Sequence, residues 1–402
     1  MIAGDTGFAA SETSARASAL KTRADAAAAV ALKHAADVDA SGRYPAEAMA
    51  MLKEQRLMGI MVPAELGGEG ATMSDAAEVC YTLGRACAST GMIYAMHLVK
   101  VACIVNHGMG VDWQESVLKR LLSEQLLFAS STTEGMGGGN VRSSAAPIMQ
   151  EADGSISLTR NASVISYGEY ADGLVTTARR SEGADASDQV LAVFMKEDYE
   201  MSLTGGWNTL GMRGTCSTGF MLKARGLPEQ VLPVAYDRIH SQTMTPAAHL
   251  LWSSVWAGIA SAALQKAQLF VRKAMRGSNG QTPPAASRLG EAHTKMRLLR
   301  GTLASALARY ERGHEDQRAW GSIDYQTALA MTKVDVSELA VDTVMACYRT
   351  CGLAGYRNDG DVSIGRHLRD ILSSPIMINN DRITASMAGA MMMSGIPNTI
   401  QN

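Results

Sequence analysis

The sequence predicts an α+β protein in which an N-terminal helical domain, a middle antiparallel β domain and a C-terminal four-helix bundle follow one another. Apolar residues recur with a helical period up to about residue 122, and short β-branched or apolar runs follow up to about residue 234. The helical period then returns and continues to the end of the chain. We therefore expect domains at 1–122, 123–234 and 235–402. A length of 402 residues fits several units, because single cores stop growing at roughly 250–300 residues.

Helices are expected in the N-terminal domain from different sequence signals. Residues 26–32 are rich in alanine, which loses no side-chain entropy in a helix. Pro45 is predicted to open a second helix, because proline costs nothing at the first helical position. Ser74 is the expected N-cap of a longer helix. One face of that helix carries its small apolar residues: Ala76, Val79, Cys80, Leu83 and Cys87.

The middle and C-terminal parts differ in the spacing at which apolar residues recur. Runs at 155–159, 173–177, 189–194 and 219–223 are short, apolar or β-branched, and bounded by Gly, Asp and Ser, which predicts strands. Later, apolar residues spaced three and four apart predict long helices joined by short polar loops, as in an antiparallel bundle.

Composition excludes several classes of function. Net charge is −2, from 37 basic and 39 acidic residues, so there is no electrostatic reason to expect nucleic acid or an anionic membrane as partner. No apolar run approaches the about 20 residues of a membrane-spanning helix. The six cysteines form no C-x-x-C pair and the eight histidines show no ligand spacing, so we expect reduced thiols, no metal and a cytoplasmic location.

Four sets of segments resemble motifs of the acyl-CoA dehydrogenase family. They are residues 39–68, 128–141, 161–217 and 349–371, and together they span nearly the whole chain. Residues 210–215 read Leu-Gly-Met-Arg-Gly-Thr, similar to the family's Leu-Gly-x-Arg-x-(Ser/Thr), which is among the most specific of these motifs. The resemblance implies a three-domain flavoprotein with FAD and a small-molecule substrate such as an acyl-CoA thioester. It also implies an electron-transfer flavoprotein or a flavin reductase as partner, and a homotetramer or homodimer.

The resemblance also assigns the flavin contacts. It places Thr132 and Thr133 beside the flavin, and Gly138 and Gly139 near the flavin and the thioester. Without the resemblance, this segment is a glycine-rich turn of a kind common on protein surfaces. The other flavin contacts that the resemblance implies either match a family motif or lie beside the position where the family has its catalytic glutamate: Val164, Ser166, Arg276, Gly352, Asn380 and Arg382.

Several of these positions depart from the family pattern. Gly139 stands where the family usually has serine, and Val164 replaces the tryptophan that usually shields the ring. The loss of that tryptophan either opens one flavin face to solvent and dioxygen or is covered by another side chain. Arg276 is the nearest match to the arginine that binds the FAD pyrophosphate in the family, although it is shifted by about two residues from the motif position. Gly352 lies in a loop that, in the family, meets the FAD of a neighbouring subunit.

The family's catalytic base is missing. The resemblance puts the usual glutamate nine residues after Arg369, where this chain has Ile378. The alternative carboxylate would stand at Ala248, and His249 follows it. Neither an isoleucine nor an alanine can remove the α-proton of a thioester.

Three residues are candidates to fill this gap. Asp381 is close in sequence to the lost glutamate, although an Asx residue there is also a typical helix N-cap. His249 adjoins the alternative position and can act as a base near neutral pH or hydrogen-bond the flavin. His97 could face the same cavity, although single histidines on helices are more often packing residues.

Three functions remain open from the sequence. The first is an FAD-dependent acyl-CoA oxidoreductase with a base relocated to Asp381 or His249. The second is a flavin-dependent monooxygenase that takes reduced flavin and O2 and oxidises a small organic substrate. The third is a non-catalytic partner subunit of a heteromer. The missing glutamate and Val164 favour the second, whereas family frequency puts the first ahead of it.

Overall fold

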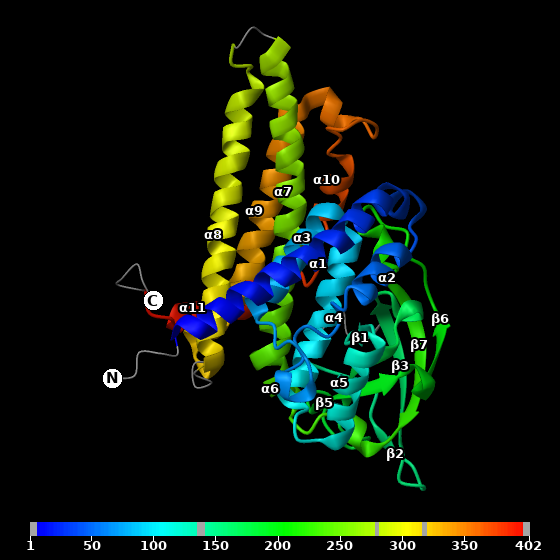
Figure 1. The fold of residues 1–402 in the computed structure, drawn as a ribbon. Coiled ribbons are helices and arrows are strands. Elements are labelled where there is room, and N and C mark those ends of the chain that lie inside the picture. The colour runs from blue at the N-terminus through cyan, green and yellow to red at the C-terminus, as the bar shows by residue number, and fades with distance from the viewer. Residues whose placement is uncertain (1–5, 135–140, 278–280, 316–319, 397–402) are drawn as a thin grey trace.

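The computed structural model describes residues 6–134, 141–277, 281–315 and 320–396. Helices of the N-terminal part lie between a pair of small β sheets and a tall group of C-terminal helices (Figure 1). The helical, β and helical order predicted from the sequence is confirmed. The predicted boundary at 122 falls in the last turn of a helix, and that at 234 falls in the connection before the first C-terminal helix.

Five helices form the N-terminal part: α1 (Thr6–Ser41), α2 (Ala46–Glu54), α3 (Met73–Ala86), α4 (Ala88–His107) and α5 (Asp112–Glu124). Pro45 precedes α2 as predicted. The predicted cap of α3 at Ser74 is two residues late, because the N-cap is Thr72: its Oγ1 accepts from the Asp75 amide, and its own amide donates to the Asp75 carboxylate. This reciprocal capping box satisfies two amides that a serine at position 74 would leave free.

Two sheets make up the middle part. One has the order β1-β4-β5, built from β1 (Phe128–Ser131), β4 (Gly173–Arg179) and β5 (Gln189–Met195). The other has the order β2-β3-β7-β6, from β2 (Met149–Gln150), β3 (Ile156–Ile165), β7 (Thr218–Gly226) and β6 (Tyr199–Leu203). The antiparallel prediction is wrong for one pair, because β1 and β4 are parallel. The chain leaves β1, forms β2 and β3 in the second sheet, and returns to the first sheet in its original direction.

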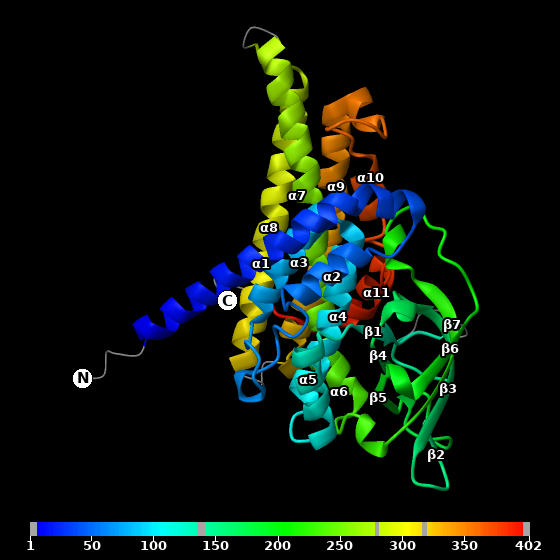
Figure 2. The ribbon, with the colours of Figure 1, turned by 45° about the vertical axis from the view of Figure 1, so that its right-hand side comes forward.

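The C-terminal part contains three long helices, α7 (Thr245–Gly277), α8 (Ala285–Glu315) and α9 (Ile323–Tyr356). The shorter α11 (Asn380–Met393) packs on α9 as the fourth, and α10 (Gly365–Ile371) packs on α7 and α9. The short α6 (Tyr236–Ile239) runs through a π-helical turn, His240–Met244, into α7. π-helical turns inside α-helices are frequent at functional sites. Figure 2 shows the tip shared by α7 and α8 at the end of the molecule opposite the sheets.

Two helical stretches are long and apolar enough to cross a membrane by composition alone. They are α4 and the continuous stretch Tyr236–Gly277, and 94% and 89% of their apolar windows are buried inside the protein. Their apolar surface is therefore covered by other parts of this chain, which gives no positive indication of a membrane.

The Leu-Gly-Met-Arg-Gly-Thr segment connects the three parts. The Met212 amide donates to Asp370 Oδ1 of α10 over 2.7 Å, and the Gly214 amide donates to Ser89 Oγ of α4 over 3.2 Å. A Cβ on Gly211 would overlap the Arg369 carbonyl, so only glycine allows this approach. The motif is thus explained by packing between domains.

Replacing Gly211 tests this packing directly. Gly211→Ala is expected to lower the free energy of unfolding by about 1–3 kcal/mol, because backbone of α10 must shift to admit the methyl group. Gly206→Ala is the matched control, since nothing lies within 4 Å of its Cβ position. Urea unfolding of both variants gives the comparison, and equal stabilities would contradict the packing role.

Candidate flavin and substrate site

Hydroxyl groups gather where β1 ends and β3 passes. Thr132 and Thr133 directly follow the last residue of β1. Ser163 Oγ of β3 donates a hydrogen bond to Thr133 Oγ1 over 3.1 Å. Two residues beyond Val164, Ser166 Oγ lies 2.7 Å from Ser217 Oγ, which in turn lies 2.7 Å from Thr215 Oγ1. We call this set the hydroxyl cluster: Thr132, Thr133, Ser163, Ser166, Thr215 and Ser217. Of the predicted flavin contacts, Thr133 therefore lies with Ser163, and Ser166 lies with Ser217 and Thr215.

Val164 lies between the two hydrogen-bonded groups of this cluster. It is 40% exposed, which is high for a large apolar residue on a strand. An exposed apolar side chain can pack against the face of a planar ring. The hydroxyls on either side of it can hydrogen-bond the edge of that ring. The described residues therefore fit a flavin ring, which would be held by the hydroxyl cluster. Gly138 and Gly139 lie outside the described residues.

Two other predicted contacts lie far from the hydroxyl cluster. Arg276 is exposed near the end of α7, and Gly352 interrupts α9 with a φ of 54° at the same tip of the helices. Gly352 lines an apolar groove there, with Phe270, Pro284 and the strongly exposed Leu353. Figures 1 and 2 both place this tip away from the sheets. One chain alone does not bring Arg276 or Gly352 to the hydroxyl cluster.

Ile378 is exposed where the family glutamate would stand. Its side chain is 39% exposed, and its φ of 47° is unusual for a β-branched residue. Lys333 Nζ donates to the Ile378 carbonyl over 2.9 Å and to Asn380 Oδ1 over 2.6 Å. Burial lowers the pKa of Lys333 to about 8. The segment around Ile378 therefore exposes an apolar side chain, and the buried Lys333 fixes its backbone by hydrogen bonds.

The neighbouring candidates have structural roles. Asn380 is buried, and its amide group also donates to Ser337 Oγ and Glu338 Oε1. Asp381 was expected to cap a helix, but Asn379 is the N-cap of α11 and accepts from the Asp381 and Arg382 amides. Asp381 is exposed in the first turn, where a carboxylate favours the helix dipole.

His97 is fully buried and both of its ring nitrogens are used. Nε2 lies 2.8 Å from the Met58 carbonyl, and Nδ1 accepts from the Phe128 amide over 3.0 Å. Burial lowers the pKa of His97 to about 4. Because both nitrogens bond backbone groups, this histidine connects α4 to β1 and has none left for a substrate.

His249 is buried in the first turns of α7, and only one of its ring nitrogens, Nδ1, has a hydrogen-bond partner among the described residues. Nδ1 lies 3.2 Å from the Leu329 carbonyl, so Nδ1 carries the hydrogen and Nε2 carries the lone pair. Burial, followed by the charge of Lys333, lowers the pKa of His249 to about 4. His249 is therefore a neutral imidazole at pH 7, able to accept one hydrogen bond or a proton.

Sequence reasoning missed two buried cations. Lys100 of α4 and Arg160 of β3 are 4% and 1% exposed; Lys100 interrupts an apolar run, and Arg160 interrupts the buried face of its strand. Such an interruption was the available signal, because charged residues are almost never fully buried without a partner. His240 and Tyr236 lie near them in the π-helical turn and α6.

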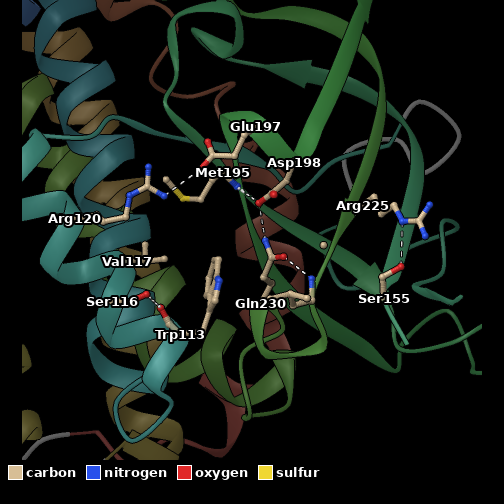
Figure 3. A pocket seen from close by; sticks show the side chains of 12 residues that line it. Trp113, Ser116, Val117, Arg120, Ser155, Met195, Glu197, Asp198, Arg225 and Gln230 are labelled. Carbon is tan, nitrogen blue, oxygen red and sulfur yellow. Dashed lines mark hydrogen bonds and ion pairs between the residues drawn. The ribbon is translucent and has the colours of Figure 1, made fainter. Parts of the chain in front are cut away.

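A surface pocket lies elsewhere. Figure 3 shows it between α5 and the second sheet, lined by Trp113, Arg120, Glu197 and Gln230 among others. Its polar groups are paired with each other: Arg120 Nη1 bonds Glu197 over 3.1 Å and Gln230 Nε2 bonds Asp198 over 2.8 Å. No candidate flavin residue lines it. We therefore locate the site at the hydroxyl cluster, where chemistry-bearing groups converge.

The chain belongs to the acyl-CoA dehydrogenase family. Residues 14–125 match the acyl-CoA dehydrogenase N-terminal domain, and residues 244–392 match the acyl-CoA dehydrogenase C-terminal domain. This membership supports the predicted flavin cofactor and the predicted fold.

The chain is similar in sequence to proteins named as a nitrososynthase and as a probable acyl-CoA dehydrogenase, and it shares its fold with a protein named as a monooxygenase. L-evernosamine nitrososynthase of Micromonospora sp. (strain ATCC 39149 / NRRL 15099 / SCC 1413) is 27% identical, over 85% of this chain and 82% of its own. A protein named as a probable acyl-CoA dehydrogenase of Mycobacterium leprae (strain TN) is 26% identical, over 87% and 88%. FMN-bound TdsC of Paenibacillus sp. A11-2, named as a dibenzothiophene monooxygenase, shares the fold with a TM-score of 0.81 and 17% identity, over 94% and 98%.

The low pKa of His249 has a measurable consequence. The unfolded chain protonates this imidazole near its ordinary pKa of 6.5 and the folded chain only near 4, so stability falls as pH drops between these values. His249→Asn keeps a donor for the Leu329 carbonyl and should lose about 3 kcal/mol less stability on acidification. Urea unfolding at pH 7 and pH 4 measures this difference. Identical losses in the two proteins would show that His249 is not protonated on unfolding.

Proposed function

We propose that this protein is a flavin-dependent monooxygenase that oxidises a small organic substrate. The observation that carries the proposal is the exposed Ile378 at the position of the family's catalytic glutamate, with Lys333 bonded to its carbonyl. A neighbouring cation disfavours proton uptake, and an isoleucine has no group to take one. α-Proton abstraction from an acyl thioester at this position is therefore unsupported, although the flavin-binding hydroxyls are present.

Bound reduced flavin supplies two electrons to dioxygen, so that one oxygen atom enters the substrate and the other leaves as water. This chain's residues have three roles. The hydroxyl cluster binds and orients the ring edge. Ile378 and Val164 give apolar surface beside the ring, which excludes water from the reacting atoms. His249 Nε2, neutral at pH 7, accepts a hydrogen bond or a proton from the substrate.

Two similar proteins support this proposal. One is named as a nitrososynthase, and another with the same fold is named as a dibenzothiophene monooxygenase. We propose FAD as the cofactor from the family pattern, with FMN as the alternative, and a flavin reductase as the source of electrons. The apolar groove around Gly352 and the exposed Leu353 support assembly into a homodimer or homotetramer.

One observation favours a second candidate, an acyl-CoA dehydrogenase with a relocated base. His249 adjoins the family's alternative carboxylate position, and its free Nε2 lone pair can accept a proton. The similarity to a probable acyl-CoA dehydrogenase supports the same reaction.

Stopped-flow spectroscopy of the flavin-loaded protein separates the two reactions. Anaerobic mixing with a panel of acyl-CoAs should leave the oxidised flavin spectrum unchanged. Mixing the chemically reduced protein with O2 should give a transient absorbance before the oxidised spectrum returns. Bleaching by any acyl-CoA would instead establish the dehydrogenase, and a protein that stays colourless with added flavin would overturn both assignments.

Restoring the carboxylate tests the same question from the other side. If the pocket still held a thioester, Ile378→Glu would add a base that contributes about 10²–10⁴-fold to α-proton removal. We expect no acyl-CoA-dependent reduction in this variant, as judged by anaerobic absorbance at the flavin band. Ile376→Glu, at a 71% exposed position of the same segment, controls for the added charge. Reduction by Ile378→Glu alone would contradict the monooxygenase proposal.

A further inference from the structure

A pocket lies between α5 and the second sheet, and none of its described lining residues belongs to the hydroxyl cluster (Figure 3). Its volume is about 490 Å³, within the roughly 300–1,000 Å³ that is usual for small-molecule sites. One wall is lined by Trp113, Ser116, Val117 and Arg120 of α5. Residues three, four and seven positions apart share one face of a helix, so a single face of α5 forms this wall.

The opposite wall is fixed by hydrogen bonds around Gln230, which is 2% exposed. Gln230 Nε2 donates to the Val193 carbonyl over 2.9 Å and to Asp198 Oδ2 over 2.8 Å. Gln230 Oε1 accepts from the Leu227 amide. Asp198 Oδ2 also accepts from the Met195 amide over 2.8 Å. The backbone that carries Leu227 and Met195, two lining residues, is therefore held in place before any ligand binds.

The cations that line the pocket already have acidic partners. Arg120 donates to Glu197 over 3.1 Å, which joins the two walls, and to Glu124 over 3.0 Å. Arg225 pairs with Asp153 over 2.6 Å. An anionic ligand would have to break one of these pairs or enter the pocket without a charged partner. The pocket therefore favours an uncharged ligand.

The surface that remains for a ligand is mainly apolar. Trp113 extends from α5 toward Gln230, and the apolar Leu227 is 52% exposed. Val117 and Met195 line the same pocket. The face of an indole ring can stack on a planar ring. None of the interactions between the residues drawn in Figure 3 ends on the Trp113 ring, so the indole N–H can donate to a ligand.

We propose that this pocket binds an uncharged aromatic molecule that carries a hydrogen-bond acceptor, such as an aromatic ketone. The ring of the ligand lies between Trp113 and Leu227, and its acceptor takes the Trp113 N–H. This is a second ligand site in addition to the flavin and substrate site, so it does not depend on which reaction the protein performs. The ligand contacts α5 and the β part at once, and its binding therefore stabilises the folded protein.

Equilibrium dialysis tests the site with naphthyl methyl ketone, which is uncharged, and with naphthoate, an anion of similar shape. We expect the natural protein to bind the ketone about 10-fold or more tightly than the anion, because the cations of the pocket are already paired. Ser116→Trp puts a large ring on the pocket face of α5 and should weaken ketone binding about 10-fold or more. Lys119→Trp is the matched control, because Lys119 is an exposed residue of the same helix that does not line the pocket. Its ketone affinity should equal that of the natural protein.

A second variant and a second readout protect the test against misfolding of Ser116→Trp. Trp113→Leu keeps an apolar side chain but lacks the indole ring and its N–H, and it should also bind the ketone more weakly. The ketone should raise the melting temperature of the natural protein and of Lys119→Trp, but not that of Ser116→Trp.

The dialysis is done with the flavin-loaded protein and repeated without flavin, and the loss in Ser116→Trp should be the same in both. A ketone that binds only at the reaction site would bind Ser116→Trp and the natural protein equally, and this result overturns the inference. Naphthoate binding as tight as ketone binding overturns it as well. Neither result bears on the monooxygenase proposal, which the flavin spectra test separately.

Discussion

The close approach of the Gly211 backbone to the last turn of α10 holds the parts of this protein together. Because Gly211 has no side chain, the Met212 amide reaches the buried Asp370 carboxylate. Burial raises the pKa of Asp370 to about 6, so at pH 7 the contact is made with a carboxylate in a poorly hydrated place. The adjacent Arg369 pairs with Asp39 of α1, which extends the connection to the N-terminal helices. Sheets and helices are thereby fixed in the arrangement that creates the site between them.

The site combines an ordinary flavin-binding surface with an altered reaction centre. Hydroxyls at the end of β1 and along β3 can hydrogen-bond the edge of a flavin ring, and such binding does not depend on which reaction follows. At the position of the family's carboxylate stands Ile378, whose carbonyl accepts a hydrogen bond from the buried Lys333, and the proposed reaction depends on this change. One fold thus carries different chemistry through a few residues, as is general for widely used folds.

The buried cations differ in how their charge is compensated. Lys333 donates to the Ile378 carbonyl and to Asn380 Oδ1, and these contacts fix the segment before α11. Arg160 Nε lies 3.8 Å from the Glu134 carboxylate. Among the described residues, Lys100 has only the Met244 thioether as an acceptor, so its burial is the least compensated of the three.

The sequence by itself determined the order of the three parts, the short runs at 155–159, 173–177, 189–194 and 219–223 that lie in strands, and the loss of the catalytic glutamate, because periodicity and motif spacing are local properties. It also indicated Thr132, Thr133 and Ser166 as flavin contacts, which stay a prediction. Only the tertiary structure decided that β1 and β4 are parallel, that both ring nitrogens of His97 bond backbone groups, and that Lys100 contacts Met244. These depend on contacts between residues far apart in the chain, and local periodicity carries no record of them.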